Sequence, residues 1–203
     1  MKNAKNEDNP IKIILLGESG VGKTCLLNAF FGQKNEEQIP TQCSLNFDGE
    51  FKYYNNSYKY CIWDTAGQEA YRAINKIYFR DAKIILIVYA IDNKNSFTNI
   101  DFWINYVKEY IQSDGYIMEI IANKEDLYES RMVMEEEGME AAQRYGIDLF
   151  TTSAISDPDG FKNHVNNLIE KYIIMYLEKN NIEENKSVKI HKIKKKKKKK
   201  KCC

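Results

Sequence analysis

The 203-residue sequence lacks a hydrophobic run long enough to cross a membrane. Its longest strongly apolar stretch, residues 84–91, is far shorter than the roughly 20 residues that a membrane-spanning helix needs. The N-terminal segment MKNAKNEDNP is polar and mixed in charge, and it lacks the apolar core of a secretory signal peptide. We therefore expect a domain that faces the cytosol.

Cysteines are few, and their spacing suits neither a metal site nor a disulfide framework. Three of the five, Cys25, Cys43 and Cys61, stand singly, and no C-x-x-C spacing occurs. This argues against zinc and against a disulfide-stapled fold. The other two, Cys202 and Cys203, are adjacent and follow an unbroken lysine run, residues 194–201. They are better candidates for modification than for folding.

Charge is divided unevenly along the chain. Acidic residues are absent from residues 186–203, which hold eleven lysines. Residues 1–185 hold the other 19 basic residues against 29 acidic ones, a net charge of −10. An acidic body joined to a basic tail indicates two parts with different partners. We predict a disordered extension over residues 1–9, one compact domain over 10–180, and a flexible polybasic tail over 181–203.

Apolar runs and helical patterns alternate through the compact domain. Residues 11–16 and 83–90 have the pattern of buried strands, and residues 44–63 resemble a hairpin around Asn55-Asn56. Residues 96–111 carry apolar side chains at helical spacing. The order of elements predicts an α/β fold, with a mostly parallel six-stranded sheet flanked by five helices. Ligands of such sheets bind at the carboxyl ends of the strands.

Residues 17–24, GESGVGKT, fit the phosphate-loop pattern G-x-x-x-x-G-K-[ST], between a predicted strand and a predicted helix. In such a loop, backbone N–H groups and the helix N-terminus hold phosphate oxygens. Lys23 would reach the β- and γ-phosphates and assist catalysis, and the Thr24 hydroxyl would bind Mg²⁺. The predicted nucleotide-binding residues of this loop are Ser19, Gly20, Val21, Gly22, Lys23, Thr24 and Cys25.

A second motif, Asp64-Thr65-Ala66-Gly67-Gln68, follows an apolar strand end. The Asp64 carboxylate would hold the metal through its hydration shell, and the Gly67 N–H would approach the γ-phosphate. Gln68 would orient the attacking water, a role that phosphoryl transfer leaves to a side chain. These positions predict hydrolysis of the bound nucleotide.

A third motif, Asn123-Lys124-Glu125-Asp126, is predicted to read the base. Asp126 would accept the N1–H and the exocyclic amino group of guanine, neither of which adenine offers. Lys124 would lie along the base, and Asn123 would tie this loop to the phosphate side. Later in the chain, Ser153 and Ala154 would complete the pocket, with the Ala154 N–H facing guanine O6. Facing adenine, Asp126 would be left unpaired, which favours GTP over ATP.

Together these motifs resemble the Ras superfamily of small GTPases over about residues 10–180, and most closely the Rab family. Trp63 before DTAGQE, the segment 71–82 and the terminal cysteine pair are typical of Rabs. The resemblance implies the P-loop NTPase (small G-protein) fold and a role in vesicle traffic. It assigns to Thr41 the binding of Mg²⁺ and the γ-phosphate, which orders its loop only with GTP.

The resemblance also gives the tail a function. It implies geranylgeranyl groups on Cys202 and Cys203. Two lipid chains and a lysine run together suit stable attachment to an anionic membrane surface. The expected location is the cytoplasmic face of an intracellular membrane, with a soluble cytosolic pool. The expected partners are an exchange factor, a GTPase-activating protein, a GDP-dissociation inhibitor and effectors. The expected state is a monomer that binds no nucleic acid.

The sequence is also compatible with other interpretations. A GTP-binding module with negligible hydrolysis is one, because residues 42–47 read QCSLNF where a Rab usually has a sequence like I-G-x-D-F. An ATP-using P-loop enzyme is another, opposed by the NKED motif. The lysine run could be a solvated low-complexity end or a nucleic-acid patch, but neither explains the paired cysteines.

Overall fold

The computed structural model describes residues 9–33, 45–65, 79–111 and 115–178. Residues 1–8 of the predicted N-terminal extension and the whole predicted tail lie outside this set. The elements are β1 (Ile11–Leu16), α1 (Lys23–Phe31), β2 (Leu45–Tyr53), β3 (Asn56–Asp64), β4 (Ala82–Ala90), α2 (Lys94–Thr98), α3 (Ile100–Tyr110), β5 (Ile117–Asn123), the 3-10 helix η3 (Glu125–Ser130), α4 (Glu135–Tyr145), β6 (Asp148–Thr151), α5 (Pro158–Tyr172) and the π-helical turn η4 (Ile173–Glu178).

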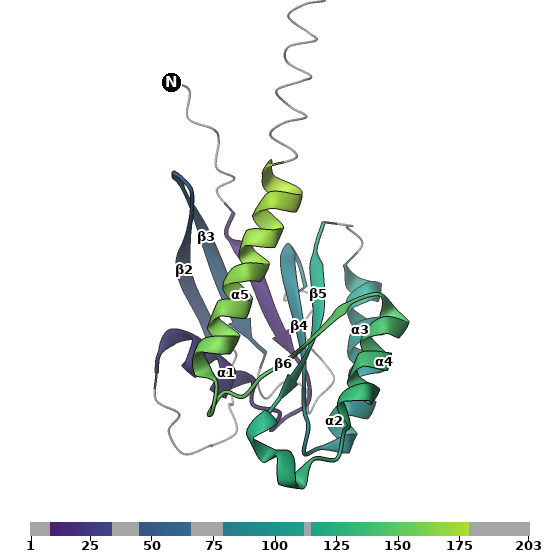
Figure 1. Ribbon diagram of the computed structural model, residues 1–203. Coiled ribbons are helices and arrows are strands. Elements are labelled where there is room, and N and C mark those ends of the chain that lie inside the picture. The colour runs from purple at the N-terminus through teal and green to yellow at the C-terminus, as the bar shows by residue number, and fades with distance from the viewer. Residues whose placement is uncertain (1–8, 34–44, 66–78, 112–114, 179–203) are drawn as a thin grey trace, which may run out of the picture.

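The six strands form one sheet in the order β2-β3-β1-β4-β5-β6 (Figure 1). Only β2 and β3 are antiparallel, and every other neighbouring pair is parallel. The predicted α/β fold is therefore confirmed, with its mostly parallel six-stranded sheet and five α-helices in the described part of the chain.

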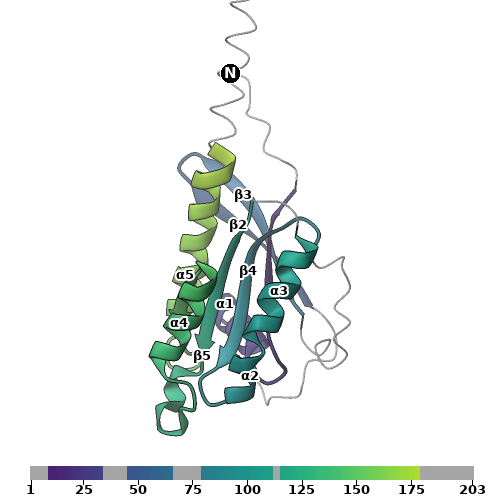
Figure 2. The ribbon, with the colours of Figure 1, turned by 90° about the vertical axis from the view of Figure 1, so that its right-hand side faces the viewer.

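The core consists of two apolar layers, one on each face of the sheet. Figure 2 shows α5 and α3 on opposite sides of the strands. Along β1, Ile13 and Leu15 pack with the α1 and α5 side chains, whereas Ile14 and Leu16 pack with those of α3. Because helices cover both faces, the central strands carry continuous apolar runs rather than an alternating pattern.

The helix predicted over residues 96–111 is two helices. The Asn93 side chain accepts a 3.0 Å hydrogen bond from the Ser96 N–H, which starts α2 before the predicted position. Thr98 Oγ1 donates to the Lys94 carbonyl, and Asn99 then leaves regular helical geometry with ψ of −1°. Side chains that bond to their own backbone compete with helical hydrogen bonds, and the apolar spacing does not reveal such a break.

The hairpin predicted around Asn55-Asn56 forms with its turn one residue earlier. Tyr53 pairs with Asn56, so the two turn residues are Tyr54 and Asn55. Tyr54 has a positive φ of 50°, unusual for an aromatic residue. Its ring is 87% exposed and contacts the Tyr53 ring edge-on.

Among the described residues, no helix combines the length and apolar character that crossing a bilayer would require.

Candidate functional site

The predicted motifs meet at one edge of the sheet. Strands β1, β3, β5 and β6 run in the same direction, so their carboxyl ends share that edge. They end at Leu16, Asp64, Asn123 and Thr151. Each predicted motif begins at or just after one of these ends, which is where ligands of parallel sheets bind.

The phosphate loop needs glycine where it passes beneath the base loop. Gly22 has a φ of 93°, which side-chain-bearing residues rarely adopt. A Cβ atom there would lie 2.4 Å from the Asn123 side-chain nitrogen. Gly17 has a φ of 142°, and its Cβ would lie 2.1 Å from the Val88 carbonyl oxygen. Glycine is therefore required at both positions, because the loop passes close to β4 and β5.

Lys23 closes the phosphate loop from inside. Its ammonium donates to the Gly17 carbonyl at 2.8 Å and to the Glu18 carbonyl at 2.9 Å. The residue is only 4% exposed, although it begins a helix at the surface. The loop thus holds a buried positive charge at the N-terminus of α1, where the helix dipole also favours an anion.

Two of the predicted metal-binding residues are in direct contact. The Thr24 hydroxyl donates a 2.6 Å hydrogen bond to the Asp64 carboxylate, which is fully buried. Thr65 fixes the end of β3, because its hydroxyl donates to the Leu15 carbonyl at 2.7 Å. A hydroxyl and a carboxylate, both oxygen donors, therefore lie together beside the phosphate loop.

Asn123 joins the base loop to the phosphate loop. Its side-chain nitrogen donates to the Val21 carbonyl at 2.8 Å. Its side-chain oxygen accepts from the Ala154 N–H at 3.4 Å. One buried amide therefore connects three segments that are far apart in sequence, as predicted for its tie to the phosphate side.

The predicted base-reading carboxylate is held by a neighbouring hydroxyl. Ser153 Oγ donates a short hydrogen bond to Asp126 and accepts from the N–H groups of Ile155 and Ser156 at 3.1 and 3.0 Å. Lys124 sits at a left-handed φ of 67°, and this turns the chain from β5 into η3. The predicted residues Asp126, Ser153 and Ala154 thus lie in one cluster at the end of β5.

Asp92 belongs to this cluster, although it lies in none of the sequence motifs. Its carboxylate lies 3.4 Å from the Lys124 ammonium and can orient the lysine stem. The position of Asp92 in the sequence could have indicated a role in the site. Asp92 follows the end of β4, and that end lies at the same edge of the sheet.

The remaining predicted site residues are either in or next to the phosphate loop or outside the described residues. Ser19 and Gly20 are exposed at the loop tip, and Val21 is buried. The Cys25 thiol is half-buried, and burial raises its pKa above the ordinary value. The predicted residues Thr41, Gly67, Gln68, Cys202 and Cys203 lie outside the described residues.

Comparison with known proteins gives one matching family model, described as Ras family, which covers residues 12–174. Human Ras-related protein Rab-8B is 41% identical over 158 residues, which are 75% of this chain and 74% of Rab-8B. Ras-related protein SEC4 of Saccharomyces cerevisiae is 34% identical over 187 residues, 92% of this chain and 83% of SEC4.

The match covers a smaller share of some other similar proteins. Rat Ras-related protein Rab-26 is 39% identical over 151 residues, which are 73% of this chain but 58% of Rab-26. The chain likewise covers 57% of mouse Rab-26 and 65% of human Rab-37. The chain thus spans less than two thirds of the length of these three relatives.

Proposed function

Since this chain belongs to the Ras family, and within it to the Rab proteins, we propose that it is a GTP-hydrolysing switch in vesicle traffic. The observation that carries the proposal is the Asn123 amide, which connects Val21 of the phosphate loop to Ala154 of the base pocket. This link holds the base pocket beside the phosphate loop. The site can therefore bind the base and the phosphates of one nucleotide at the same time.

Guanine is selected at the base end. The Asp126 carboxylate accepts the two donors on the guanine edge, and Ser153 holds it in place for that contact. Adenine would leave this carboxylate without donors, and an unpaired polar group in a closed site costs affinity. Lys124, oriented by Asp92, covers the base with its methylene stem.

The phosphates are held by the loop backbone and by Lys23. The buried ammonium supplies positive charge against the β- and γ-phosphates, where charge develops during transfer. Transition-state charge in this reaction is stabilised mainly by such preorganised groups.

The donor set beside the loop fits Mg²⁺. Thr24 and Asp64 offer a hydroxyl and a carboxylate at 2.6 Å from each other. Mg²⁺ prefers oxygen ligands and takes few from the protein, because phosphates and waters fill the rest. Thr24, Asp64 and, in the GTP form, Thr41 would hold the ion. Held there, the ion would supply positive charge beside the phosphates.

Hydrolysis is slow without a partner. Gln68 orients the attacking water, and Gly67 together with Thr41 responds to the γ-phosphate. Residues 17–24 contain no arginine that could act on the transition state from within the loop. A GTPase-activating protein that supplies an arginine adds roughly 10³–10⁵ in rate.

The remaining partners act through the switch segments and the tail. Residues 10–180 form the GTP-binding domain, and residues 181–203 form the tether. Prenyl groups on Cys202 and Cys203, with the lysine run, attach the protein to the cytoplasmic face of an intracellular membrane. An exchange factor loads GTP, effectors bind the GTP form, and a GDP-dissociation inhibitor maintains a cytosolic pool. The protein acts as a monomer.

Two measurements test the nucleotide proposal. Displacement of a fluorescent mant-GDP by GDP but not by ADP is expected, and equal competition by ADP would exclude the base assignment. Single-turnover hydrolysis of GTP should slow by at least about tenfold in Gln68→Leu, because the attacking water loses its orienting group. Equal rates in both proteins would instead favour a GTP-binding module without hydrolysis.

A further inference from the structure

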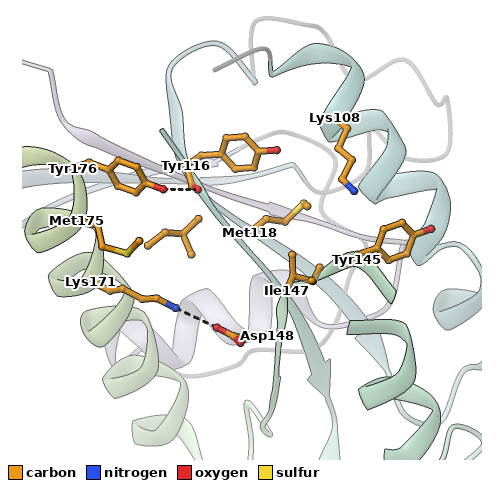
Figure 3. Close-up of a pocket in the computed structure, with 11 residues that line it drawn as sticks. Lys108, Tyr116, Met118, Tyr145, Ile147, Asp148, Lys171, Met175 and Tyr176 are labelled. Carbon is orange, nitrogen blue, oxygen red and sulfur yellow. Dashed lines mark hydrogen bonds and ion pairs between the residues drawn. The ribbon is translucent and has the colours of Figure 1, made fainter. Parts of the chain in front are cut away.

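A groove lies at the end of the molecule opposite the nucleotide site. It has a volume of about 370 Å³ and lies where α3, the first residues of β5 and β6, α5 and η4 come together (Figure 3). It exists because β6 begins late. Asp148, the first residue of β6, pairs with Glu119, so Ile117 and Met118 at the start of β5 have no β6 residue opposite them.

The groove is apolar in its centre and positive at its rim. Figure 3 shows Met118 and Ile147 in the centre, with Lys108 and Lys171 on opposite sides. The Lys108 ammonium lies 4.9 Å from the centre of the Tyr145 ring. The Lys171 ammonium lies 3.2 Å from the Asp148 carboxylate, and these side chains are 46% and 70% exposed. With two lysines and one acid among the lining residues, the groove has a net charge of +1.

We propose that residues 180–184 of this chain, Asn-Asn-Ile-Glu-Glu, occupy the groove. Ile182 is the one apolar residue between Lys179 and Ser187, and it suits the space beside Met118 and Ile147. Glu183 and Glu184 are the last acidic residues of the chain, and they complement Lys108 and Lys171. An apolar residue followed by two acids therefore matches an apolar centre between two lysines.

The segment starts close enough to reach the groove. Met175 and Tyr176 form one wall of it, and η4 ends only two residues later at Glu178. Four further residues lead to Ile182, and they span at most about 14 Å when fully extended. The Tyr176 hydroxyl donates to the Tyr116 carbonyl at 3.4 Å, which fixes the wall from which the segment departs.

Occupation of the groove changes the tether between the domain and its lysine run. With residues 180–184 bound, the free part of the tether shortens from residues 179–193 to residues 185–193. The groove then determines how closely the domain is held to whatever the lysine run binds. This role lies outside the nucleotide chemistry and does not depend on it.

Hydrogen exchange of the unprenylated protein of residues 1–203 tests the proposal. Amides of residues 180–184 are expected to exchange about tenfold more slowly than in a free peptide of the same sequence, given one buried isoleucine and two exposed ion pairs. Lys108→Glu with Lys171→Glu should remove this protection. Adding Glu183→Lys and Glu184→Lys to those changes should restore it. Ile182→Ser alone should reduce it.

Controls separate this effect from misfolding and from other occupants. The pair Lys59→Glu with Lys162→Glu makes the same charge change at exposed positions and should leave the exchange unchanged. Binding of mant-GDP checks the fold of every variant. Unprotected amides in the parent protein, or no rescue by the second charge reversal, would overturn the proposal. Protection of the groove by anionic lipid vesicles that is independent of Ile182, Glu183 and Glu184 would also overturn it, in favour of a lipid headgroup.

Discussion

The Asn123 side-chain nitrogen donates a 2.8 Å hydrogen bond to the carbonyl oxygen of Val21, 102 residues earlier in the chain. This contact brings the base loop onto the phosphate loop immediately before Gly22. The two loops therefore pack against each other. A change in either loop should affect the binding of both the base and the phosphates.

Gly22→Ala should lower the affinity for GDP by at least about tenfold, because the site combines a positive φ with a collision. The new Cβ would lie 2.4 Å from the Asn123 side-chain nitrogen. Titration with mant-GDP measures the effect. Gly20→Ala is the matched control, since its φ is also positive but its Cβ meets nothing within 4 Å. An equal loss in both variants would show that the Asn123 contact is not the cause.

Asp126→Asn should change which base is bound. The affinity for GDP should fall by about 100-fold or more, because an amide cannot accept both guanine donors through two oxygens. Xanthine carries a carbonyl where guanine has its amino group, so the new amide should improve binding of XDP. Competition against mant-GDP measures both. Asp159→Asn, at an exposed position on α5, should leave both affinities unchanged.

Glu119 is the one charged residue of β5, and its carboxylate is paired with the His164 imidazole. Glu119 is 3% exposed, its carboxylate lies 2.5 Å from His164 Nε2, and the imidazole stacks on the Phe150 ring. His164→Ala should lower the free energy of unfolding by about 3 kcal/mol, because it leaves a buried carboxylate unpaired. Urea unfolding in excess GDP measures this.

A double variant tests whether pairing is the reason. Glu119→Leu combined with His164→Leu removes both polar groups, so it should cost less than His164→Ala alone. A double variant as unstable as the single one would show that packing on Phe150, rather than the hydrogen bond between Glu119 and His164, stabilises this region.

Tyr89 should make the folded protein sensitive to alkaline pH. Burial raises the pKa of Tyr89 to about 12, from an ordinary value of 10. The folded state therefore favours the neutral phenol, so its contribution is complete below pH 10 and is lost as the pH rises toward 12. The loss amounts to about 2–3 kcal/mol.

Tyr89→Phe should remove this part of the pH dependence, because phenylalanine has no group to ionise. The measurement is the free energy of unfolding in urea on both sides of the interval from pH 10 to 12. Tyr54→Phe, at a side chain 87% exposed, should keep the parent pH profile. An unchanged profile in Tyr89→Phe would contradict the assignment to Tyr89.

Replacing Cys202 and Cys203 by serine should move the protein from membranes to the soluble fraction of cells. The reason is that two lipid chains give stable attachment, whereas a lysine run alone attracts anionic surfaces weakly and in a salt-dependent manner. Fractionation measures the distribution, and mant-GDP affinity should stay at the parent value. Continued membrane association of the double variant would refute lipid anchoring. Replacing the eight lysines of residues 194–201 by glutamine should weaken attachment without abolishing it.

Much of the fold could be predicted because its signals are local. The continuous apolar run of β4 requires cover on both faces, and that requirement indicates a parallel sheet wrapped by helices. The resemblance to Rab proteins rested on contiguous motifs, and it is confirmed by the family model and by the similarity to Rab-8B and SEC4. Element boundaries were less predictable. The start of α2 at Lys94 and its end at Thr98 coincide with side-chain hydrogen bonds of Asn93 and Thr98, which do not disturb the apolar spacing.

The sequence by itself determined the phosphate loop, because GESGVGKT encodes its own backbone geometry: glycines where φ is positive, then a lysine at the start of a helix. It also determined that a base-reading motif follows a buried strand. Only the tertiary structure decided that Thr24 touches Asp64, that Asp92 orients Lys124 and that a groove opens beside Met118. These relationships depend on strand order and register, which bring together residues as far apart in sequence as Thr24 and Asp64, 40 positions, and Asp92 and Lys124, 32 positions. No short stretch of sequence specifies them, because they result from packing the whole sheet.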